Sequence, residues 1–247
     1  MSTAPYLSLI LPAFDEVNAI GVTLEEVCRY FIARGIEHEI IVAADGTDGT
    51  RELVADMAKT NHALRVIGNE QRLGKGKGIR DAIRIAKGKF IGYADADNKV
   101  PIDEFDKIRP HLESGFDLVI GSRALAQSKI ERSQPLYRQV GSSGFHLFMQ
   151  TVVGLPGVHD SQCGFKFFAS AAARRIFGMQ RIDGYMFDVE ILSLAIRLGY
   201  RIREVPICWH DDGDSRLQLF RGNLQNVVDI FRIRLNGIRV NSTLEKE

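Results

Sequence analysis

The sequence has no long apolar run, and it contains few cysteines, the residues that form disulfides in secreted proteins and bind zinc in structural metal sites. No stretch of about 18 apolar residues occurs among its 247 residues, so we expect no membrane-spanning helix. The opening residues carry no basic segment ahead of an apolar core, which argues against a signal peptide. The three cysteines, Cys28, Cys163 and Cys208, lie far apart, and their spacing fits neither a disulfide framework nor a zinc site. We therefore expect a reducing, cytoplasmic location, with Cys163 as a buried structural residue.

The sequence also lacks an excess of charge of either sign. The formal net charge is +1, so no global field attracts nucleic acid or lipid, and any such affinity must be local. Internal repeats and low-complexity linkers are absent as well. Hydrophobic residues make up 45% of the chain and charged residues 26%, which is typical of a soluble globular protein. The length suits one large α/β domain, with or without an appendage.

What the sequence does contain is a regular alternation of short apolar runs and amphipathic segments. In the first half, strands are expected over residues 6–11, 38–44, 64–67, 90–94 and 117–120, and helices over residues 18–34, 50–59, 76–86 and 102–112. In the second half, helices are expected over residues 137–153 and 187–198, and extended chain over residues 164–168 and 201–209. Continuous apolar strands that alternate with helices predict an α/β fold with a mostly parallel central sheet and helices on both faces.

Polar side chains follow the first expected strand, at the sheet edge where open α/β proteins bind ligands. Pro12 ends that strand in this interpretation, Phe14 is placed to lie against a flat base, and Glu16 to accept hydrogen bonds from ribose hydroxyls. The structural alternative is that Asp15 or Asn18 caps the next helix. Asp45 follows the second expected strand and is placed to accept from a base N–H group, while Asp48 or Thr50 caps the helix behind it.

A glycine-lysine run precedes the helix expected over residues 76–86. Gly74, Gly76 and Gly78 permit a close approach of the backbone, and the N-terminus of a helix favours anions. We therefore predict that Lys75 contacts a phosphate. The run does not match a nucleotide-binding consensus. The basic residues that follow it on the helix are interpreted as a solvated face, because no aromatic residues are interleaved with them, and no nucleic-acid partner is expected.

Two carboxylates, Asp95 and Asp97, follow the apolar strand over residues 90–94. In extended chain the two side chains project to the same side, where like charges repel. Hard oxygen donors in that arrangement suit Mg²⁺ or Mn²⁺, which also binds phosphate oxygens of a substrate. The alternative is an acidic turn in which Asp97 caps the next helix. The position after the fourth strand, in line with the acids of the first two strand ends, favours the metal site.

These motifs together resemble a known family. The resemblance rests on PxFxE at Pro12–Glu16, Asp45 ahead of DGT, GKG at Gly74–Gly76, DAD at Asp95–Asp97 and GSR at Gly121–Arg123. They resemble the inverting glycosyltransferases of GT-A fold. The later stretches Asp160–Phe168, Phe187–Trp209 and Asp214–Leu217 narrow the resemblance to the polyprenyl-phosphate sugar synthases, of the dolichyl-phosphate glucosyltransferase type more than the mannosyltransferase type.

The resemblance implies a transferase that moves a hexose, with glucose favoured, from a UDP- or GDP-sugar to a polyprenyl phosphate with the help of Mg²⁺ or Mn²⁺. It assigns the nucleoside to Pro12, Phe14, Glu16, Ala43 and Asp45, the metal and diphosphate to Asp95, Ala96 and Asp97, and phosphates to Arg123 and Arg216. The chain departs from the family at Phe14 and Asp15, where tyrosine and asparagine are usual. His210 stands where the mannosyl enzymes carry an arginine, which disfavours mannose and leaves sugar and base open.

The acceptor decides which further groups the reaction needs. A phosphate monoester is already anionic, so cations that guide it matter more than a base, and Arg123, Lys166 and Arg216 are the candidates. A soluble hydroxyl acceptor, such as a saccharide, needs a carboxylate base, for which Asp188 is the best candidate. Asp188 and Glu190 equally suit the first turn of a helix. The catalytic candidates are therefore Asp97, Arg123 and Asp188. A nucleotide-sugar binding module without activity is the alternative outside enzymes.

The last 30 residues, 218–247, are expected to form an amphipathic helical extension of a glycosyltransferase domain over residues 1–217. Its apolar face is formed by Leu224, Val227, Val228, Phe231, Leu235 and Ile238. Arginines dominate the charged residues around that face, a pattern that suits a helix lying on an anionic membrane surface. Docking on its own domain, or on a second copy in a homodimer, fits the periodicity equally well.

Overall fold

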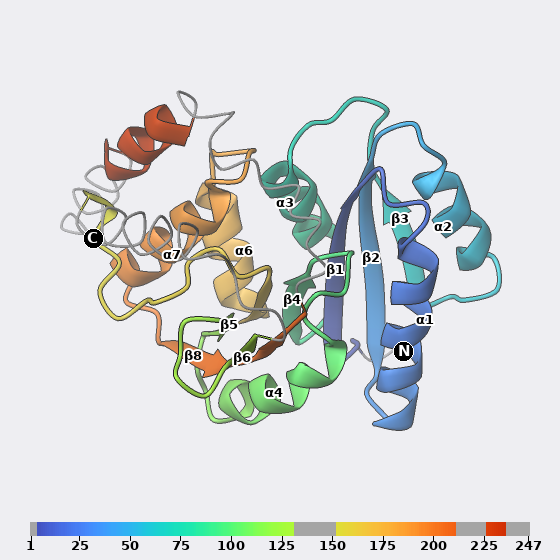
Figure 1. Cartoon of the computed structure of the whole chain (residues 1–247), viewed down its shortest axis with the longest axis horizontal. Helices are drawn as coiled ribbons and strands as arrows, with labels where there is room; N and C mark the ends of the chain where they lie inside the picture. Colours follow the sequence, from blue (N-terminus) through green and yellow to red (C-terminus); the bar gives the residue numbers. More distant parts are fainter. Residues whose placement is uncertain (1–3, 131–151, 211–225, 236–247) are drawn as a thin grey trace.

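The computed structural model of the chain describes residues 4–130, 152–210 and 226–235. Its centre is a seven-stranded sheet in the order β3-β2-β1-β4-β7-β5-β8 (Figure 1). The strands are β1 (Leu7–Phe14), β2 (His38–Asp45), β3 (Leu64–Ile67), β4 (Phe90–Ala94), β5 (Leu118–Ser122), β7 (Phe165–Ala169) and β8 (Ile202–Pro206). Only β7 runs antiparallel to its neighbours among these described strands, so the predicted mostly parallel sheet is confirmed.

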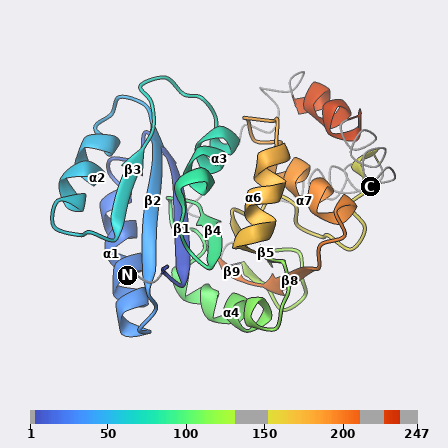
Figure 2. The ribbon, with the colours of Figure 1, turned by 180° about the vertical axis from the view of Figure 1, so that it is seen from behind.

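Helices cover both faces of this sheet, as predicted. They are α1 (Ile20–Ala33), α2 (Thr50–Ala58), α3 (Lys75–Ile85), α4 (Phe105–Glu113), α6 (Ser170–Met179) and α7 (Phe187–Arg197), with a short 3₁₀ turn (Ile102–Glu104) before α4. One apolar core joins α3, α6 and α7 to one face of the strands, and a second joins α1, α2 and α4 to the other face. In Figure 2 the sheet begins with β3 at its outer edge and continues through β2, β1 and β4.

The first strand is longer than predicted. β1 continues through Pro12 to Phe14, so the prediction that Pro12 ends the strand is wrong. The last paired position between β1 and β4 is Ile10 with Tyr93, while Pro12 lies opposite Ala43 of β2. Beyond Ile10, β1 is no longer hydrogen-bonded to β4. A proline, which has no backbone N–H group, therefore interrupts no hydrogen bond on that side of the strand.

The second half of the chain differs most from the prediction. The extended segment over residues 164–168 is confirmed as β7, but it lies between β4 and β5 in the middle of the sheet. The helix α6 was not predicted. The single strand predicted over residues 201–209 is wrong, because the chain leaves the main sheet after β8 and forms β9 (Cys208–Trp209), which pairs with β6 (Lys129–Ile130). The helix predicted over residues 137–153 lies almost entirely outside the described residues.

The described part of the C-terminal extension, residues 226–235, is helical. Ile230 and Ile233 are buried in the core that contains α6 and α7, whereas Phe231 and Leu235 are exposed. This helix therefore docks on its own domain and still presents apolar side chains outward. The domain boundary predicted at residue 217 falls outside the described residues and stays a prediction. No helix in the described ranges combines the length and apolar character needed to cross a bilayer.

Candidate active site

The carboxyl ends of β1 and β2 meet at one edge of the sheet and bring the predicted nucleoside residues together. Pro12 and Ala43 are cross-strand partners, and Phe14 and Asp45 are the last pair of the same ladder. The backbone N–H of Glu16 donates to Thr50 Oγ1 at 3.0 Å and thereby ties the loop after β1 to the start of α2. All five predicted nucleoside residues thus lie at one edge of the sheet, and their contacts with a nucleotide stay a prediction.

Helix capping near this edge follows only part of the prediction. The residue at the N-cap position of α1 is Ala19, which has no side chain that could accept a hydrogen bond from the helix. The predicted cap from Asp15 or Asn18 is therefore not confirmed. Asp48 does hold the start of α2, because its Oδ1 accepts the N–H of Thr50 at 3.0 Å. Its Oδ2 accepts the N–H of Val17 at 3.0 Å, which links the loops that follow β1 and β2.

Asp45 binds the loop between β3 and α3. Its Oδ1 accepts the N–H of Asn69 at 3.1 Å, and its Oδ2 accepts the N–H of Leu73 at 2.8 Å. The carboxylate thus holds this loop at both ends. The sequence did not predict this partner, because the loop lies 24 and 28 residues further along the chain. The role of Asp45 toward a base stays a prediction.

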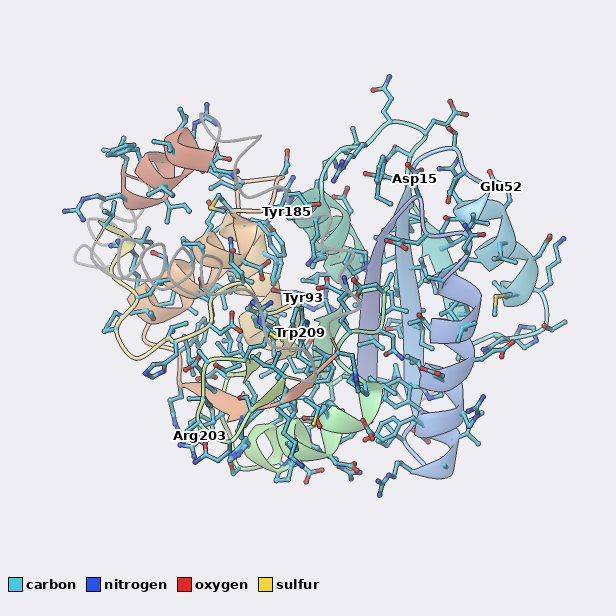
Figure 3. The ribbon with its side chains drawn as sticks, in the orientation of Figure 1. Asp15, Glu52, Tyr93, Tyr185, Arg203 and Trp209 are labelled. Carbon is cyan, nitrogen blue, oxygen red and sulfur yellow. The ribbon has the colours of Figure 1, made fainter. Side chains whose placement is uncertain are left out.

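The face of the Phe14 ring carries a planar cation. The guanidinium carbon of Arg72 lies 4.2 Å from the ring centroid, and Arg72 Nη2 donates to the hydroxyl of Tyr185 at 2.9 Å. Figure 3 shows Tyr185 on the side of α7 that faces α3. Sequence reasoning missed Arg72 and Tyr185, which lie on loops 113 residues apart. The Arg72 guanidinium lies over a face of the Phe14 ring. The role of Phe14 toward a base stays a prediction.

The acidic pair lies on a turn and not on extended chain. β4 ends at Ala94, and the N–H of Asn98 donates to the carbonyl of Asp95 at 3.3 Å, with Asn98 in the left-handed region at a φ of 53°. The expectation that Asp95 and Asp97 project together from a strand is therefore wrong. The alternative that Asp97 caps a helix is also not confirmed, because the 3₁₀ turn before α4 follows Pro101.

Each aspartate of this turn is paired with a lysine. Lys75 Nζ lies 2.5 Å from Asp95 Oδ1, and Lys99 Nζ lies 3.2 Å from Asp97 Oδ2. Burial, and next the charge of Asp95, raise the pKa of Asp97 against the opposing effect of Lys99. The direction of this shift agrees with the repulsion predicted for the pair. Burial disfavours the charge on Lys75, but Asp95 and Asp188 outweigh it and raise the pKa of the lysine.

Lys75 was predicted to contact a phosphate at the N-terminus of α3. That N-terminus is already used, because the first amide groups of α3, those of Gly76 and Lys77, donate to the carbonyl of Asp183 at 2.8 and 3.3 Å. The side chain of Lys75 is paired with Asp95. Its contact with a phosphate stays a prediction.

The donor set of Asp95 and Asp97 fits a divalent cation. Carboxylate oxygens are the ligands that Mg²⁺ prefers. In this structure the ammonium groups of Lys75 and Lys99 form ion pairs with the two carboxylates. A side chain at Gly164 would place its Cβ 2.0 Å from Asp95 Oδ2, so the missing side chain leaves room for this carboxylate. No group of three or more metal-ligating side chains occurs in the described part of the chain. Two carboxylates supply part of a coordination sphere, and phosphate oxygens of a substrate would have to complete it.

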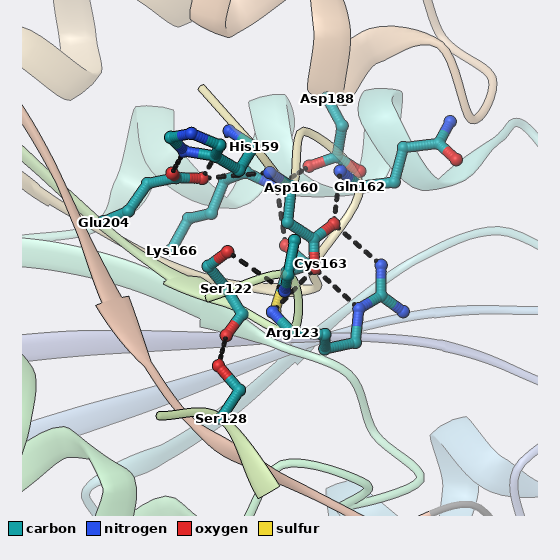
Figure 4. A network of polar contacts seen from close by, with 11 residues as sticks. Ser122, Arg123, Ser128, His159, Asp160, Gln162, Cys163, Lys166, Asp188 and Glu204 are labelled. Atoms are coloured by element: carbon teal, nitrogen blue, oxygen red, sulfur yellow. Dashed lines mark hydrogen bonds and ion pairs between the residues drawn. The ribbon is translucent and has the colours of Figure 1, made fainter. Parts of the chain in front are cut away.

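A buried network lies beside the acidic turn (Figure 4). Lys166 is fully buried, and its Nζ donates to Asp188 Oδ1 at 2.6 Å and to the carbonyl of Cys163 at 2.5 Å. The hydroxyl of Tyr93 donates to the same Asp188 oxygen at 2.5 Å. Burial, followed by the charge of Asp188, raises the pKa of Tyr93 far above its ordinary value. Tyr93 had not been predicted as a site residue, because it reads as part of an apolar strand.

This network places two predicted site residues in the protein interior. Asp188 lies in the first turn of α7 as predicted, but its carboxylate serves Lys166 and Tyr93. The neighbouring acid Glu190 accepts the backbone N–H groups of Arg181 and Ile182 and holds the loop before α7. The roles of Asp188 as a base and of Lys166 as a phosphate contact stay predictions.

Arg123 is engaged by an acid that the sequence did not assign. Its Nε and Nη2 donate to the two oxygens of Asp160 at 2.7 and 2.8 Å (Figure 4). Its guanidinium carbon lies 5.6 Å from the ring centroid of Trp209. Glu204 holds the loop before Asp160 through the N–H groups of His159 and Asp160, both at 2.9 Å. The predicted phosphate contact of Arg123 stays a prediction. The predicted contact of Arg216 lies outside the described residues.

Ala96, which the family resemblance assigned to the metal and diphosphate, lies between the two aspartates. It is buried, and its carbonyl accepts the hydroxyl proton of Thr23 on α1 at 2.8 Å. This bond anchors the acidic turn to the first helix. The backbone N–H of Asp95 donates to Gly164 at 3.1 Å and anchors the same turn to the segment before β7. The turn is therefore held by α1 and by the chain that enters β7.

Known proteins resemble this chain in sequence and in fold. Residues 8–177 match the family described as glycosyl transferase family 2. The dolichyl-phosphate beta-glucosyltransferases of Dictyostelium discoideum and Saccharomyces cerevisiae are 32% and 30% identical over 93% of this chain and 74% of their own length. The corresponding human protein is 29% identical over 95% of this chain and 76% of its length.

Solved structures agree with this assignment. The glucosyl-3-phosphoglycerate synthase of Mycobacterium tuberculosis, crystallised with Mn²⁺, UDP-glucose and phosphoglyceric acid, has a TM-score of 0.65 at 18% identity and covers 93% of this chain and 79% of its own. The mannosyl-3-phosphoglycerate synthase of Rubrobacter xylanophilus has a TM-score of 0.64 at 18% identity, over 98% and 74% of the two chains. These likenesses confirm the predicted GT-A fold. With the match across most of the sequence, they show that the chain is a glycosyltransferase and belongs to glycosyl transferase family 2.

Proposed function

We propose that this protein transfers glucose from a nucleotide-diphosphate donor to a polyprenyl phosphate. The observation that carries the proposal is the pair of carboxylates beyond β4, Asp95 and Asp97, beside the strand ends that gather the nucleoside residues. The similarity to dolichyl-phosphate beta-glucosyltransferases over 93% of the chain supports both the sugar and the acceptor.

In the donor half of the site, the nucleoside lies along the ends of β1 and β2. Phe14 stacks on the base, Asp45 accepts from a base N–H group, and Glu16 accepts from the ribose. Asp95 and Asp97, with the backbone at Ala96, hold the divalent cation and the diphosphate; when bound, Mg²⁺ or Mn²⁺ neutralises the diphosphate as it departs. The UDP-glucose and Mn²⁺ bound by the mycobacterial synthase support this donor class.

In the acceptor half, an anionic phosphate monoester attacks the sugar carbon. Such a nucleophile needs no strong base near neutral pH, so positive charge that aligns it matters more. Arg123, Lys166 and Arg216 supply that charge, and Asp188 orients Lys166 and Tyr93 from within the protein. A hydroxyl acceptor would need Asp188 as the base, and the two hydrogen bonds that its Oδ1 already accepts favour the phosphate acceptor.

The helix over residues 226–235 supports the inference that the enzyme acts at a membrane surface. Val227, Val228, Phe231 and Leu235 are between 43% and 62% exposed, while Ile230 and Ile233 on the other side are buried. Exposing this many apolar groups is unfavourable in water and favourable at the boundary of a bilayer, where a polyprenyl chain also lies. We infer peripheral attachment through this face; a second copy of the chain is the competing partner for it.

A transfer assay tests the proposed function. The purified chain is incubated with Mn²⁺, radiolabelled UDP-glucose or GDP-mannose, and a short polyprenyl phosphate in detergent. We expect label in the lipid fraction with UDP-glucose only, and none when the polyprenyl phosphate is replaced by free saccharides. Label in the saccharide fraction instead would establish a soluble acceptor. Donor binding without transfer to any acceptor would leave a binding module and overturn the proposal.

A further inference from the structure

Glu204 on β8 is a buried acid to which the sequence assigned no role. Its side chain is only 7% exposed, and its Oε1 accepts the backbone N–H groups of His159 and Asp160, both at 2.9 Å. Its Oε2 lies 2.6 Å from Nδ1 of the His159 ring, and Figure 4 shows the three residues together. One carboxylate therefore holds the chain at two successive residues and at one side chain.

The second of these residues, Asp160, is the acid that orients Arg123. Asp160 Oδ2 accepts the backbone N–H and the Nε of Arg123 at 3.0 and 2.7 Å, and Asp160 Oδ1 accepts Nη2 at 2.8 Å. The two parallel side-chain bonds fix the plane of the guanidinium as well as its position. A shift of the Asp160 backbone would therefore move the guanidinium, so Glu204 is linked to Arg123 through Asp160.

The sheet gives this link a rigid base. β8 runs parallel to β5, with Glu204 opposite Ile120, and Arg123 directly follows the end of β5. Glu204 and the backbone of Arg123 are thus fixed by neighbouring strands, and the loop that carries Asp160 is tied to both of them. A side chain that is supported from regular elements holds its geometry more precisely than one supported by loops alone.

Arg123 keeps donors that a phosphate can use. A guanidinium group has five N–H donors, and the side-chain pair with Asp160 takes one from Nε and one from Nη2. The Arg123 side chain is 30% exposed. Burial disfavours its charge, but Asp160 outweighs burial and raises the pKa of Arg123, and the charge of Asp95 acts in the same direction. The guanidinium therefore lies within electrostatic reach of the acidic turn.

We propose that Glu204 is a positioning residue for the transfer: it places Asp160, and through Asp160 it places the guanidinium of Arg123 where the phosphate of the acceptor binds. This inference rests on the proposed function, because it requires a phosphate acceptor that Arg123 contacts. Glu204 acts through the reach of its side chain to two backbone N–H groups, and its charge is not required.

Two conservative variants separate reach from charge. Glu204→Gln keeps the length and an oxygen for both backbone N–H groups, and its amide nitrogen can donate to Nδ1 of His159. Glu204→Asp keeps the charge but is one methylene shorter, so the Asp160 backbone must move to reach it. We expect the KM for a short polyprenyl phosphate to stay within about twofold in Glu204→Gln and to rise about tenfold in Glu204→Asp.

Donor binding provides the readout that a general structural defect would disturb. We expect the KM for UDP-glucose, and the affinity for UDP at saturating Mn²⁺, to stay unchanged in both variants. The transfer assay with UDP-glucose and Mn²⁺ gives the two KM values, and calorimetry gives the affinity for UDP. Thermal unfolding checks that each variant is folded.

Glu39→Asp is the matched control. Glu39 is likewise buried, at 8% exposed, and its carboxylate accepts the hydroxyl of Ser8 and the backbone N–H of Lys87. It lies near the start of β2, at the amino ends of the strands, whereas Arg123 follows the carboxyl end of β5. We expect this variant to be less stable than the unmodified protein and to leave the KM for polyprenyl phosphate unchanged.

An Arg123→Lys background tests the route of the effect. Lysine keeps a positive charge beside Asp160 but cannot form the two parallel bonds, so we expect Arg123→Lys alone to raise the KM for polyprenyl phosphate. Adding Glu204→Asp should raise it no further, because the two residues act in series. A further tenfold rise in the double variant would show that Glu204 acts by another route and would overturn the proposal.

Two other results would also overturn it. An unchanged KM for polyprenyl phosphate in folded Glu204→Asp would show that Arg123 does not depend on Glu204. A rise in Glu204→Gln as large as that in Glu204→Asp would assign the effect to the charge of Glu204. Failure of the proposed function looks different: the unmodified protein would then transfer no glucose to polyprenyl phosphate, or Arg123→Lys would leave its KM unchanged.

Discussion

The guanidinium of Arg123 and the carboxylate of Asp160 form two parallel hydrogen bonds, and the backbone N–H of Arg123 adds a third to the same carboxylate at 3.0 Å. Asp160 is 8% exposed. Burial alone would raise its pKa, but Arg123 outweighs burial and lowers the pKa of Asp160 to about 2. This pair joins the end of β5 to the segment before β7, and it sets where Arg123 lies beside Trp209.

Replacing this acid should destabilise the protein in a way that depends on pH. The pKa of Asp160 is lower in the folded protein than in the unfolded chain, so its contribution to stability is present above pH 4 and is lost as the pH falls toward about 2. We expect Asp160→Asn to lower the free energy of unfolding at pH 7 by about 2–4 kcal/mol. The difference from the unmodified protein should shrink below about pH 4.

Urea unfolding from pH 7 down to pH 3 measures this difference. Asp56→Asn is the control, because Asp56 is an exposed acid whose partner Lys59 lies 2.7 Å away at the surface. We expect that variant to change the free energy of unfolding by less than about 1 kcal/mol at any of these pH values. A loss in Asp160→Asn that stayed constant down to pH 3 would contradict the role given to the ion pair.

Removing one acid of the turn should abolish the effect of metal on donor binding. We expect UDP-glucose with Mn²⁺ to raise the unfolding temperature of the unmodified protein, because a ligand that binds only the folded state stabilises it. In Asp97→Asn this metal-dependent rise should disappear. Differential scanning fluorimetry measures it, with Asp103→Asn, an exposed acid of the 3₁₀ turn, as the control. A full metal-dependent rise in Asp97→Asn would rule out the acidic pair as the metal site.

The buried pair of Lys166 and Asp188 should behave as a unit. Lys166→Met leaves the carboxylate of Asp188 buried beside Tyr93 without its nearest cation, and we expect a loss of about 3–5 kcal/mol in the free energy of unfolding. The double variant Lys166→Met with Asp188→Asn removes both charges and should recover part of that loss. Urea unfolding of Lys166→Met, Asp188→Asn and the double variant, compared with the unmodified protein, forms a double-mutant cycle. Additive losses would show that the two charges do not interact.

Alanine substitutions at two glycines, Gly164 and Gly178, test whether the position of the Asp95 carboxylate matters for donor binding. Gly164→Ala would place a methyl group 2.0 Å from Asp95 Oδ2, whereas a methyl group at Gly178 of α6 meets nothing within 4 Å. We expect Gly164→Ala to weaken Mn²⁺-dependent UDP binding strongly. Gly178→Ala should leave that binding unchanged and stabilise the fold by about 0.5–1 kcal/mol. Equal UDP binding by both variants, measured by calorimetry, would show that the position of Asp95 does not matter.

The exposed face of the C-terminal helix should decide membrane binding. Phe231→Asp and Leu235→Asp introduce charge at residues that are 54% and 62% exposed, so we expect little change in stability and a clear loss of sedimentation with anionic vesicles. Ile32→Asp on α1 is the control, since Ile32 is even more exposed, at 74%. Unchanged sedimentation, together with a change from dimer to monomer in size-exclusion chromatography, would assign this face to a second copy.

Short-range patterns explain how much of the fold could be predicted. β3 and β4 have the predicted bounds, because each is a run of apolar residues between polar segments. α7 was one residue too long in the prediction, an error typical of helix ends. Acids at the ends of apolar strands likewise predicted which residues lie together at the carboxyl edge of the sheet, and the candidate site there stays a prediction. The prediction that Pro12 ends the first strand was wrong, because a proline is tolerated in β1 beyond the last hydrogen-bonded pair with β4, and the position of that pair cannot be predicted from local sequence.

The sequence by itself therefore determined the alternation of strands and helices, the edge where the site lies and the residue types gathered there, because these follow from periodicity within a few neighbours. Only the tertiary structure decided the antiparallel place of β7 and the partner of each charge. Lys75 meets Asp95 across 20 residues, and Lys166 meets Asp188 across 22. Such pairs depend on how α3, β7 and α7 pack around the end of β4, and packing between distant segments leaves no local signal in a single sequence.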